Sequence, residues 1–296
     1  MKEKPFSKYQ ILANAVMIIW TLAIILPFIL LFMSSITDEN TLVANGYSFF
    51  PKKFSLASYS YIIKSGGQIL KAYGVSICVT VVGTLLNVLL SALMAYPLSV
   101  KNLPGRNVMM FFVFFTMLFN GGIVPSYIMW TGTFHIKDTI FAQLLPNFLL
   151  SAWNVMMIRT YFTTSIPDGL YEAAEIDGAS QFTIFWKIVL PLGKPILVTM
   201  GTFAGLAYWN DWTNGLYYIV KNTGLYNVQN LLNQMVQNIQ FLTQSSNSNV
   251  TAAASTIPAT GIQMAIAFVA ILPIMLIFPS FQKYYAKGIA LGAVKG

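Results

Sequence analysis

Charged residues are scarce in this 296-residue sequence. Only 9% of its residues are Asp, Glu, Lys or Arg, whereas soluble domains carry about 25%. Hydrophobic residues make up 56% of the chain, and its mean hydropathy is +0.65. This composition excludes an ordinary soluble domain and predicts an all-α, polytopic membrane protein.

Residues that usually carry catalysis or metal binding are also nearly absent. Cys78 is the single cysteine, so no intrachain disulfide can form, and His135 is the single histidine, without partners at metal-ligand spacing. No Gly-x-x-x-x-Gly-Lys-Ser/Thr phosphate loop occurs in the chain. We therefore expect no catalytic residue, no metal and no cofactor in this chain. Basic, aromatic-interleaved clusters typical of nucleic-acid binding are missing as well.

Six apolar runs are long enough to cross the hydrocarbon core of a bilayer, which needs about 20 residues. They cover residues 11–33, 73–98, 108–130, 140–162, 188–212 and 262–282. The first is longer than the core of a signal peptide, and no small-residue cleavage site follows it, so we interpret it as an uncleaved helix. The six runs predict that residues 1–296 form a single membrane domain with six transmembrane helices.

The positions of Lys and Arg predict the orientation of these spans, because positive charge is retained on the cytoplasmic side of short loops. With the N-terminus inside, 11 of the 17 basic residues fall in cytoplasmic segments. Both termini are therefore predicted to be cytoplasmic. The net charge of +8 is mostly this topology signal.

The third run is interrupted by Asn120 and the two glycines that follow it, and then by Pro125. Such a break frees backbone groups that lipid cannot satisfy, and interrupted segments often line a transport pathway. The alternative is a helix that ends near Phe119 and restarts outside the membrane. Both interpretations remain open at this stage.

The fifth run closes with a second polar group, made of Tyr208, Trp209, Asn210 and Asp211. Polar residues at membrane depth usually face a bundle interior or an aqueous cavity. Tyr and Trp, by contrast, also anchor helices at the membrane interface. We interpret most aromatics as anchors and expect Asn210 and Asp211 to face a cavity. Together with Asn120, residues 208–211 are the candidate substrate pathway.

Two segments are predicted to lie on the outer side of the membrane. Residues 34–72 contain turn formers and a short helix around residues 59–63. Residues 213–261 are longer than a connector needs, and Asn227 to Phe241 has the spacing of an amphipathic helix. This helix either binds a partner or lies flat on the membrane surface.

Residues 163–190 form a polar insert between the fourth and fifth runs. Ser165 is expected to cap a helix that runs to about Asp177 and stops at Gly178, because glycine readily adopts the conformation that ends helices. Ser180 can cap a second short helix. The insert is predicted to be an L of two helices that projects into the cytosol.

The first helix of this insert has a surface suited to docking. Ala173 and Ala174 form a low-profile face, and Glu172, Glu175 and Asp177 supply negative charge at its edges. Paired carboxylates can perform acid–base chemistry, but no nucleophile or metal ligand lies near them in the sequence. We therefore expect contact with a partner and no enzymatic activity.

The spacing in this insert resembles a known signature. Glu172-Ala173-Ala174 is followed by Gly178, then by Ile188 and Leu190-Pro191, as in the cytoplasmic loop of permease subunits of binding-protein-dependent ABC importers. The resemblance covers nearly the whole chain and implies a coupling loop between the fourth and fifth of six spans. It implies that this loop transmits movements of the ATPases through Glu172, Ala173, Ala174, Asp177, Gly178, Ile188, Leu190 and Pro191.

The C-terminal sequence narrows the resemblance. Residues 288–296 look like the tail of the second, G-type subunit of maltose-type carbohydrate permeases. In that family the tail reaches the ATPase dimer interface, which would involve Gly292, Ala293, Val294, Lys295 and Gly296. Residues 119–125 and 208–212 are similar to the subgroup assigned to complex oligosaccharides, including aldouronate-type permeases.

The resemblance implies a set of partners. These are a second permease in a heterodimer, two ATPase subunits that bind ATP and Mg, and an extracellular sugar-binding protein that delivers an oligosaccharide in a bacterial cell membrane. One alternative is an ABC permease for another small polar solute. A secondary transporter would need charges inside the spans for ion coupling, and Asp211, at an edge, is almost the only one.

Overall fold

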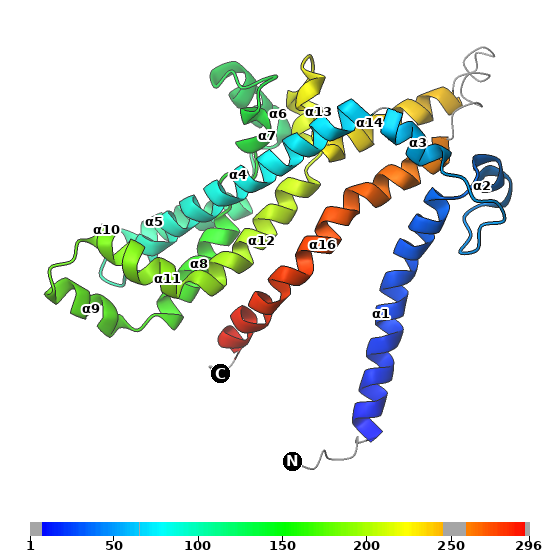
Figure 1. Cartoon of the computed structure of the whole chain (residues 1–296). Coiled ribbons are helices and arrows are strands. Elements are labelled where there is room, and N and C mark those ends of the chain that lie inside the picture. The colour runs from blue at the N-terminus through cyan, green and yellow to red at the C-terminus, as the bar shows by residue number, and fades with distance from the viewer. Residues whose placement is uncertain (1–7, 65, 245–258, 294–296) are drawn as a thin grey trace. The chain divides into compact units, whose positions relative to one another are not determined.

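The computed structural model describes residues 8–64, 66–244 and 259–293. Within these ranges the chain is helical apart from turns, loops and one isolated β-bridge between Thr37 and Phe54. The chain divides into two compact units. The first contains Met1–Ile69 and Leu232–Pro273, and the second contains Leu70–Leu231 and Ile274–Gly296. The all-α prediction is confirmed for the described residues (Figure 1).

The first unit contains α1 (Lys8–Ser35), α2 (Glu39–Asn45), α3 (Ala57–Lys64) and the beginning of α16 (Ala259–Ala293). The rings of Phe32 and Phe268 lie 4.9 Å apart, which joins α1 to α16. The Glu39 carboxylate accepts hydrogen bonds from the first amides of α16, at Thr260 (2.9 Å) and Gly261 (2.8 Å). A carboxylate at this position satisfies free N–H groups and complements the helix dipole.

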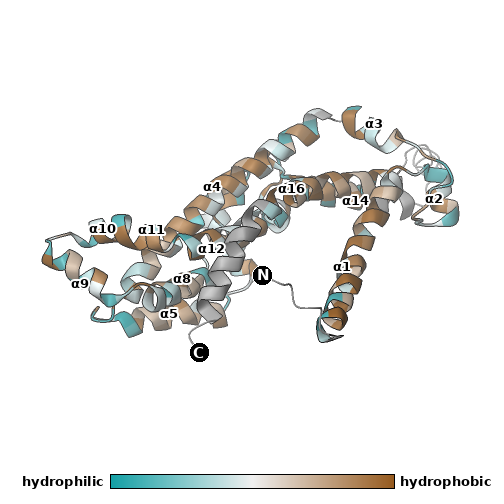
Figure 2. Cartoon of the chain, turned by 60° about the horizontal axis from the view of Figure 1, so that its bottom comes forward, coloured by the Kyte–Doolittle hydropathy of each residue, from teal (hydrophilic) through white to brown (hydrophobic). Residues whose placement is uncertain are grey.

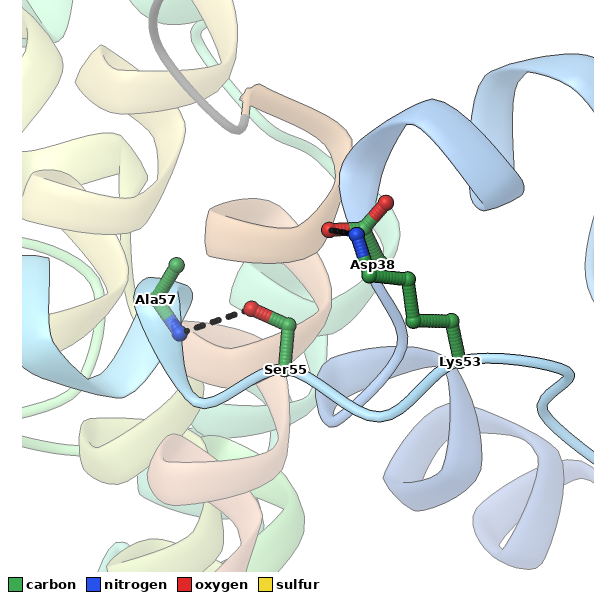
Figure 3. A network of polar contacts seen from close by, with 4 residues as sticks. All are labelled: Asp38, Lys53, Ser55 and Ala57. Atoms are coloured by element: carbon green, nitrogen blue, oxygen red, sulfur yellow. Dashed lines mark hydrogen bonds and ion pairs between the residues drawn. The ribbon is translucent and has the colours of Figure 1, made fainter.

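Polar contacts order the loop that joins α2 to α3 (Figure 3). The Lys53 ammonium lies 3.5 Å from the Asp38 carboxylate, and the Asp38 amide donates to the Lys53 carbonyl at 3.0 Å. Ser55 Oγ accepts a hydrogen bond from the Ala57 amide at 3.2 Å, at the start of α3. The short helix predicted around residues 59–63 is therefore confirmed as α3.

The second unit is built from many shorter helices. Its first half contains most of α4 (Gly66–Ser99), then α5 (Arg106–Leu118), α6 (Ile123–Ile128), η1 (Met129–Thr133), α7 (Phe141–Leu144) and α8 (Ala152–Ser165). Its second half contains α9 (Asp168–Ile176), α10 (Gln181–Ile184), η2 (Phe185–Val189), α11 (Leu190–Leu192), α12 (Lys194–Asn210), α13 (Thr213–Tyr218), η3 (Thr223–Leu225) and the start of α14 (Val228–Gln244).

The apolar helices agree in part with the six predicted spans. Three helices are long and apolar enough to cross a membrane, namely Tyr9–Ser35, Gly67–Ser99 and Thr260–Ile277. Two bent pairs also qualify if each is one span, Arg106–Leu118 with Ile123–Thr133 at 110° and Gln181–Leu192 with Lys194–Asn210 at 78°. By length and composition the described residues thus provide three to five spans. The hydrophobic character of α1 is visible along its length (Figure 2).

The prediction of one continuous span over residues 140–162 is wrong. The helix α7 has 4 residues, and α8 begins only at Ala152. Pro146 lacks an amide donor, and Asn147 has a positive φ of 67°. Distant side chains satisfy the freed carbonyls, because Asn214 donates to Pro146 at 3.1 Å and Asn87 donates to Phe148 at 2.6 Å. A broken helix is tolerated at membrane depth when protein groups replace its lost bonds.

The interruption predicted in the third run is confirmed. The helix α5 ends at Leu118, and α6 begins at Ile123 after Gly122, whose φ of 87° is in the left-handed region. The helix predicted from Asn227 to Phe241 is confirmed as α14. Most of the polar stretch that follows it lies outside the described residues.

Candidate functional site

The end of α9 is shaped by Gly178. The φ of Gly178 is +75°, and its amide donates to the Glu175 carbonyl at 3.0 Å. The Ala179 amide donates to the Ala174 carbonyl at 2.9 Å. This pair of bonds around a left-handed residue is a Schellman motif, which satisfies carbonyls at a helix end. The stop predicted at Gly178 is therefore confirmed.

The two predicted helix caps have different outcomes. Ser180 Oγ accepts a hydrogen bond from the Thr183 amide at 3.2 Å, so Ser180 caps α10 as predicted. The prediction that Ser165 caps α9 is wrong, because Ser165 is the last residue of α8 and α9 begins at Asp168. The apolar packing of α8 continues to its C-cap residue Ile166, which is buried, and this keeps Ser165 in the last turn of the preceding helix.

Polar contacts fix both helices of the insert to the rest of the second unit. The Tyr96 hydroxyl donates to Gln181 Oε1 at 2.5 Å, and Gln181 Nε2 donates to Glu175 Oε1 at 2.9 Å. This chain of bonds connects α4 to α10 and α10 to α9. The Lys101 ammonium lies 2.5 Å from the Asp168 carboxylate, so the loop after α4 is joined to the start of α9.

Apolar packing supports the same attachment. The insert shares one cluster of buried side chains with α4, α5, α8 and α12; the cluster includes Ala95, Tyr96, Val155, Ile158, Phe162, Ala174, Ile184, Phe185 and Val189. The rings of Tyr96 and Phe185 lie 5.4 Å apart. Burial also raises the pKa of Tyr171, in α9, to about 12. In the ribbon, α9 follows α8, and α10 leads through η2 into α11, so both ends of the insert join the second unit (Figure 1).

The two alanines of the signature have different surroundings. Ala174 is buried in the cluster, whereas Ala173 is exposed. Glu172 and Asp177 are exposed near Ala173, and Ile176 is 86% exposed, although it is a large apolar residue. The outer face of α9 therefore combines a small residue, an exposed isoleucine and carboxylates, and this face is available for a partner.

The remaining signature residues lie where the insert joins α12. Ile188 and Leu190 are half-buried and pack against the cluster, and Pro191 is exposed in α11. Gly193, which the sequence reasoning missed, allows close packing: an added Cβ would lie 2.5 Å from Phe162 Cε1. A glycine two residues after the Leu190-Pro191 pair was the only signal in the sequence that could have identified it.

The candidate pathway residues do not share one environment. Asn120 is exposed in the turn between α5 and α6, where its Oδ1 accepts a hydrogen bond from the Gly122 amide at 2.9 Å. Asn210 is exposed at the end of α12. Tyr208 is buried, and its hydroxyl donates to the Leu144 carbonyl at 2.8 Å. Trp209 is buried with its ring 6.4 Å from that of Tyr73.

Asp211 is buried and supports the local backbone. It is 5% exposed, and its Oδ1 accepts hydrogen bonds from the Thr213 amide (3.0 Å), the Thr213 hydroxyl (2.7 Å) and the Asn214 amide (3.2 Å). These are the first amides of α13, so the carboxylate acts as a cap there. The Asp211 carbonyl also accepts from Asn227 Nδ2 at 2.7 Å.

Sequence reasoning missed the polar network around Asp211. Asn230 donates to the Trp212 carbonyl and accepts from Gln143 Nε2 at 3.2 Å, and Asn214 accepts from Asn147 Nδ2 at 3.1 Å. Gln143, Asn214, Asn227 and Asn230 are all buried. A run of amide side chains near the end of a span was visible in the sequence, but their partners come from segments far apart along the chain.

A second carboxylate organises the same region. Asp138 has a positive φ of 59°, and its Oδ1 accepts hydrogen bonds from the amides of Val220 (2.6 Å), Lys221 (2.7 Å) and Asn222 (3.2 Å). The pKa of Asp138 lies below its ordinary value, chiefly because of the hydrogen bond from Lys221. Asp138 therefore holds the segment after α13 against the loop before α7.

The predicted tail is described only in part. Gly292 and Ala293 are the last residues of α16. Val294, Lys295 and Gly296 lie outside the described residues.

Comparison with known proteins agrees with this architecture. Residues 79–291 match the family described as binding-protein-dependent transport system inner membrane component. The chain is 36% identical to Protein LplC of Bacillus subtilis (strain 168), over 92% of this chain and 90% of that one. It is also 36% identical to the polygalacturonan/rhamnogalacturonan transport system permease protein YtcP of the same organism, over 97% of this chain and 98% of that one.

A solved structure is similar over nearly the whole length. It is a chain of a bacterial ABC transporter involved in the import of the acidic polysaccharide alginate. The TM-score is 0.79 at 26% identity, with 95% of this chain and 100% of the other covered.

Proposed function

This chain belongs to the family of binding-protein-dependent transport system inner membrane components, and from this premise we propose how its parts serve transport. It is a permease subunit of an ABC importer for carbohydrates. Its relatives include transport system permease proteins named for polygalacturonan/rhamnogalacturonan and for arabinooligosaccharides, and the similar solved structure comes from an ABC transporter that imports alginate. The finer assignment comprises six membrane crossings, of which the fourth is broken between α7 and α8. It also places both termini in the cytoplasm and makes residues 163–190 a cytoplasmic coupling loop.

We propose that α9 is the helix that receives movement from the ATPases. This assignment rests on the burial of two neighbouring residues: Ala174 is buried in the chain's own core, whereas Ala173 is exposed, as is Ile176. A force on the outer face is thereby transmitted to α4, α8 and α12 through packed side chains. ATP binding would close the ATPases, move this loop and switch the spans between inward-open and outward-open states as rigid bodies.

Cross-linking tests this assignment. In a Cys78→Ala background, Ala173→Cys should cross-link to an ATPase subunit in the assembled importer, with a yield that changes when ATP is added. Gly132→Cys, in η1, is the matched control, because an added Cβ there meets open space and the site lies on the predicted outer side. Equal yields for the two cysteines would contradict the coupling assignment.

The C-terminal residues 292–296 are proposed to sense closure of the ATPases. This rests on their similarity to the tail of maltose-type permeases. Deleting Gly292 to Gly296 should weaken the dependence of ATP hydrolysis on the loaded binding protein, while the permease pair stays assembled. Unchanged stimulation in the truncated complex would mean that the tail is a passive terminus.

The proposed substrate is an oligosaccharide that contains acidic sugars. The relative YtcP is named for polygalacturonan and rhamnogalacturonan, and the similar structure comes from an importer of the acidic polysaccharide alginate. Uptake of an oligogalacturonate and of a neutral oligosaccharide of equal length, measured with the complete importer, would decide between the two classes.

The exposed amides Asn120 and Asn210 are proposed to meet the sugar, whereas the buried Tyr208, Trp209 and Asp211 hold the shape of the path. An exposed amide can exchange water for sugar hydroxyls at little cost. Asn120→Leu should reduce uptake without loss of assembly. Labelling that shows Asn120 facing lipid, away from the second permease, would exclude it from the path.

Partners complete the proposed assembly. They are a second permease in a heterodimer, two ATPases that bind ATP and Mg, and an extracellular sugar-binding protein. The break between α13 and α14 and the long segment 213–261 would meet the binding protein on the outer side.

A further inference from the structure

Two arginines converge on one backbone carbonyl at the end of α4. Arg106, the first residue of α5, donates its Nε–H to the Leu98 carbonyl at 2.9 Å, and Arg159, in α8, donates its Nε–H to the same oxygen at 3.2 Å. Leu98 is in the last turn of α4, where carbonyls lack helical partners and cations are favoured. The two guanidinium groups are thereby held side by side.

The two positive charges have no negative counterpart among the described residues. The ion pairs there are Lys53 with Asp38 and Lys101 with Asp168, and neither involves these arginines. Each guanidinium uses only its Nε–H in the hydrogen bonds of the described chain, so the remaining donors are free to bind an anion. Two like charges at close range favour an anion between or beside them.

The surroundings of the pair are apolar on the side that enters the membrane. Met109 lies one turn beyond Arg106 in α5 and is 40% exposed. Met156 lies about one turn before Arg159 in α8 and is partly buried against the core cluster. Arginine forks bind phosphate in a bidentate manner, and basic pockets between membrane helices on the cytoplasmic side bind anionic head groups.

We propose that Arg106 and Arg159 form a binding site for the phosphate of an anionic phospholipid in the cytoplasmic leaflet. The phosphate would lie against the two guanidinium groups, and the acyl chains would run along the apolar surface near Met109 and Met156. A free phosphate ion would use the arginines but not this apolar surface, which is why the geometry favours a lipid. The site rests on the proposed orientation of the chain and is independent of the sugar carried.

Native mass spectrometry of the assembled importer tests the site. The probes are phosphatidylglycerol, phosphatidylcholine and inorganic phosphate. The wild-type complex should bind phosphatidylglycerol more tightly than phosphatidylcholine. The double variant Arg106→Gln/Arg159→Gln should weaken phosphatidylglycerol binding by about 25-fold, from about five-fold per arginine, the equivalent of about 1 kcal/mol each. Lys137→Gln, which removes one exposed charge from the loop after η1, should leave the affinity unchanged.

Other results would overturn the proposal. Phosphatidylglycerol binding that survives in the double variant would show that the arginines are not the site. Displacement of the lipid by equal concentrations of inorganic phosphate would identify a free-anion site instead. Loss of the ATPases from the double variant with lipid affinity intact would assign the arginines to a protein partner. If the double variant does not assemble, the test is the relative affinity of the wild-type complex for phosphatidylglycerol and phosphatidylcholine. A preference for phosphatidylglycerol that disappears at high salt supports the site, and equal affinity for the two lipids refutes it.

Discussion

Replacing Gly178 tests whether the end of α9 controls coupling. The residue has a φ of +75°, and an added Cβ would meet no atom within 4 Å. A substitution therefore acts through backbone strain and not through a clash. Valine is the most informative choice, because a β-branched side chain is poorly compatible with the left-handed conformation.

The free-energy cost of Gly178→Val can be estimated for two cases, in which the valine either keeps the left-handed conformation or leaves it. A non-glycine residue in the left-handed conformation costs about 1–2 kcal/mol, with valine at the upper end. If the chain avoids this strain, it loses the hydrogen bonds from Gly178 to Glu175 and from Ala179 to Ala174, worth about 1 kcal/mol each. In either case the native conformation at the end of α9 becomes about 2 kcal/mol less stable relative to distorted conformations. The ratio of native to distorted conformations then falls by a factor of about 30.

The assay is ATP hydrolysis stimulated by the loaded binding protein, together with sugar uptake, in the reconstituted importer. We expect Gly178→Val to reduce both, Gly178→Ala to reduce them less, and Gly178→Asn to stay near wild type, because asparagine tolerates the left-handed conformation. Gly169→Ala, in the first turn of the same helix and also facing open space, is the matched control. It should leave coupling intact.

Assembly must be measured in parallel, since the prediction concerns coupling and not insertion. Normal uptake and normal stimulation in a correctly assembled Gly178→Val importer would refute the reasoning. A graded loss that does not follow the order Asn, Ala, Val would also refute it, because the order comes from the backbone conformation alone.

Three further predictions concern the polar network around Asp211 and the neighbouring Asp138. Gly215→Ala should lower the thermal stability of the permease by several degrees, because an added Cβ would clash with the side chain of Asn230, and Gly132→Ala, which faces open space, should not. Asp211→Leu should cost about 1–3 kcal/mol by leaving buried amides unpaired, while Asp211→Asn keeps the acceptor; loss of uptake in a stable Asp211→Asn variant would instead show that the charge serves transport. Because the folded-state pKa of Asp138 is lowered, its contribution to stability is present above the ordinary pKa and disappears as pH falls through the lowered value. Hydrogen-exchange protection of amides 220–222 should fall in that acidic range, and Asp138→Asn should show weaker protection at neutral pH.

Local chemistry explains what the sequence predicted correctly. The stop at Gly178, the cap at Ser180 and the break after Leu118 each depend on residues within one or two turns, since glycine supplies a left-handed φ and serine supplies an acceptor at a helix start. The composition similarly predicted apolar helices, because an apolar helix satisfies its own backbone hydrogen bonds where lipid cannot.

Residues far apart in the chain decided the rest. The break between α7 and α8 is stable because Asn87 and Asn214 supply the missing hydrogen bonds, and neither residue is near it in sequence. Asp211 was expected to face a cavity. Instead it is buried, and its carbonyl accepts a hydrogen bond from Asn227, directly before α14, while Gln143 in α7 and Asn230 in α14 are bonded to each other nearby.

The neighbouring residues Ala173 and Ala174 also show which features depend on local sequence and which depend on tertiary packing. The sequence alone determined that a short helix with small and acidic residues ends at Gly178, because that outcome depends on local backbone preferences. Only the packing of Tyr96, Ile184 and Phe185 determined that Ala174 is buried and Ala173 is exposed. The convergence of Arg106 and Arg159 on Leu98 likewise required three helices to meet. Tertiary contacts decide such features, because which face of a helix is buried depends on the elements packed against it.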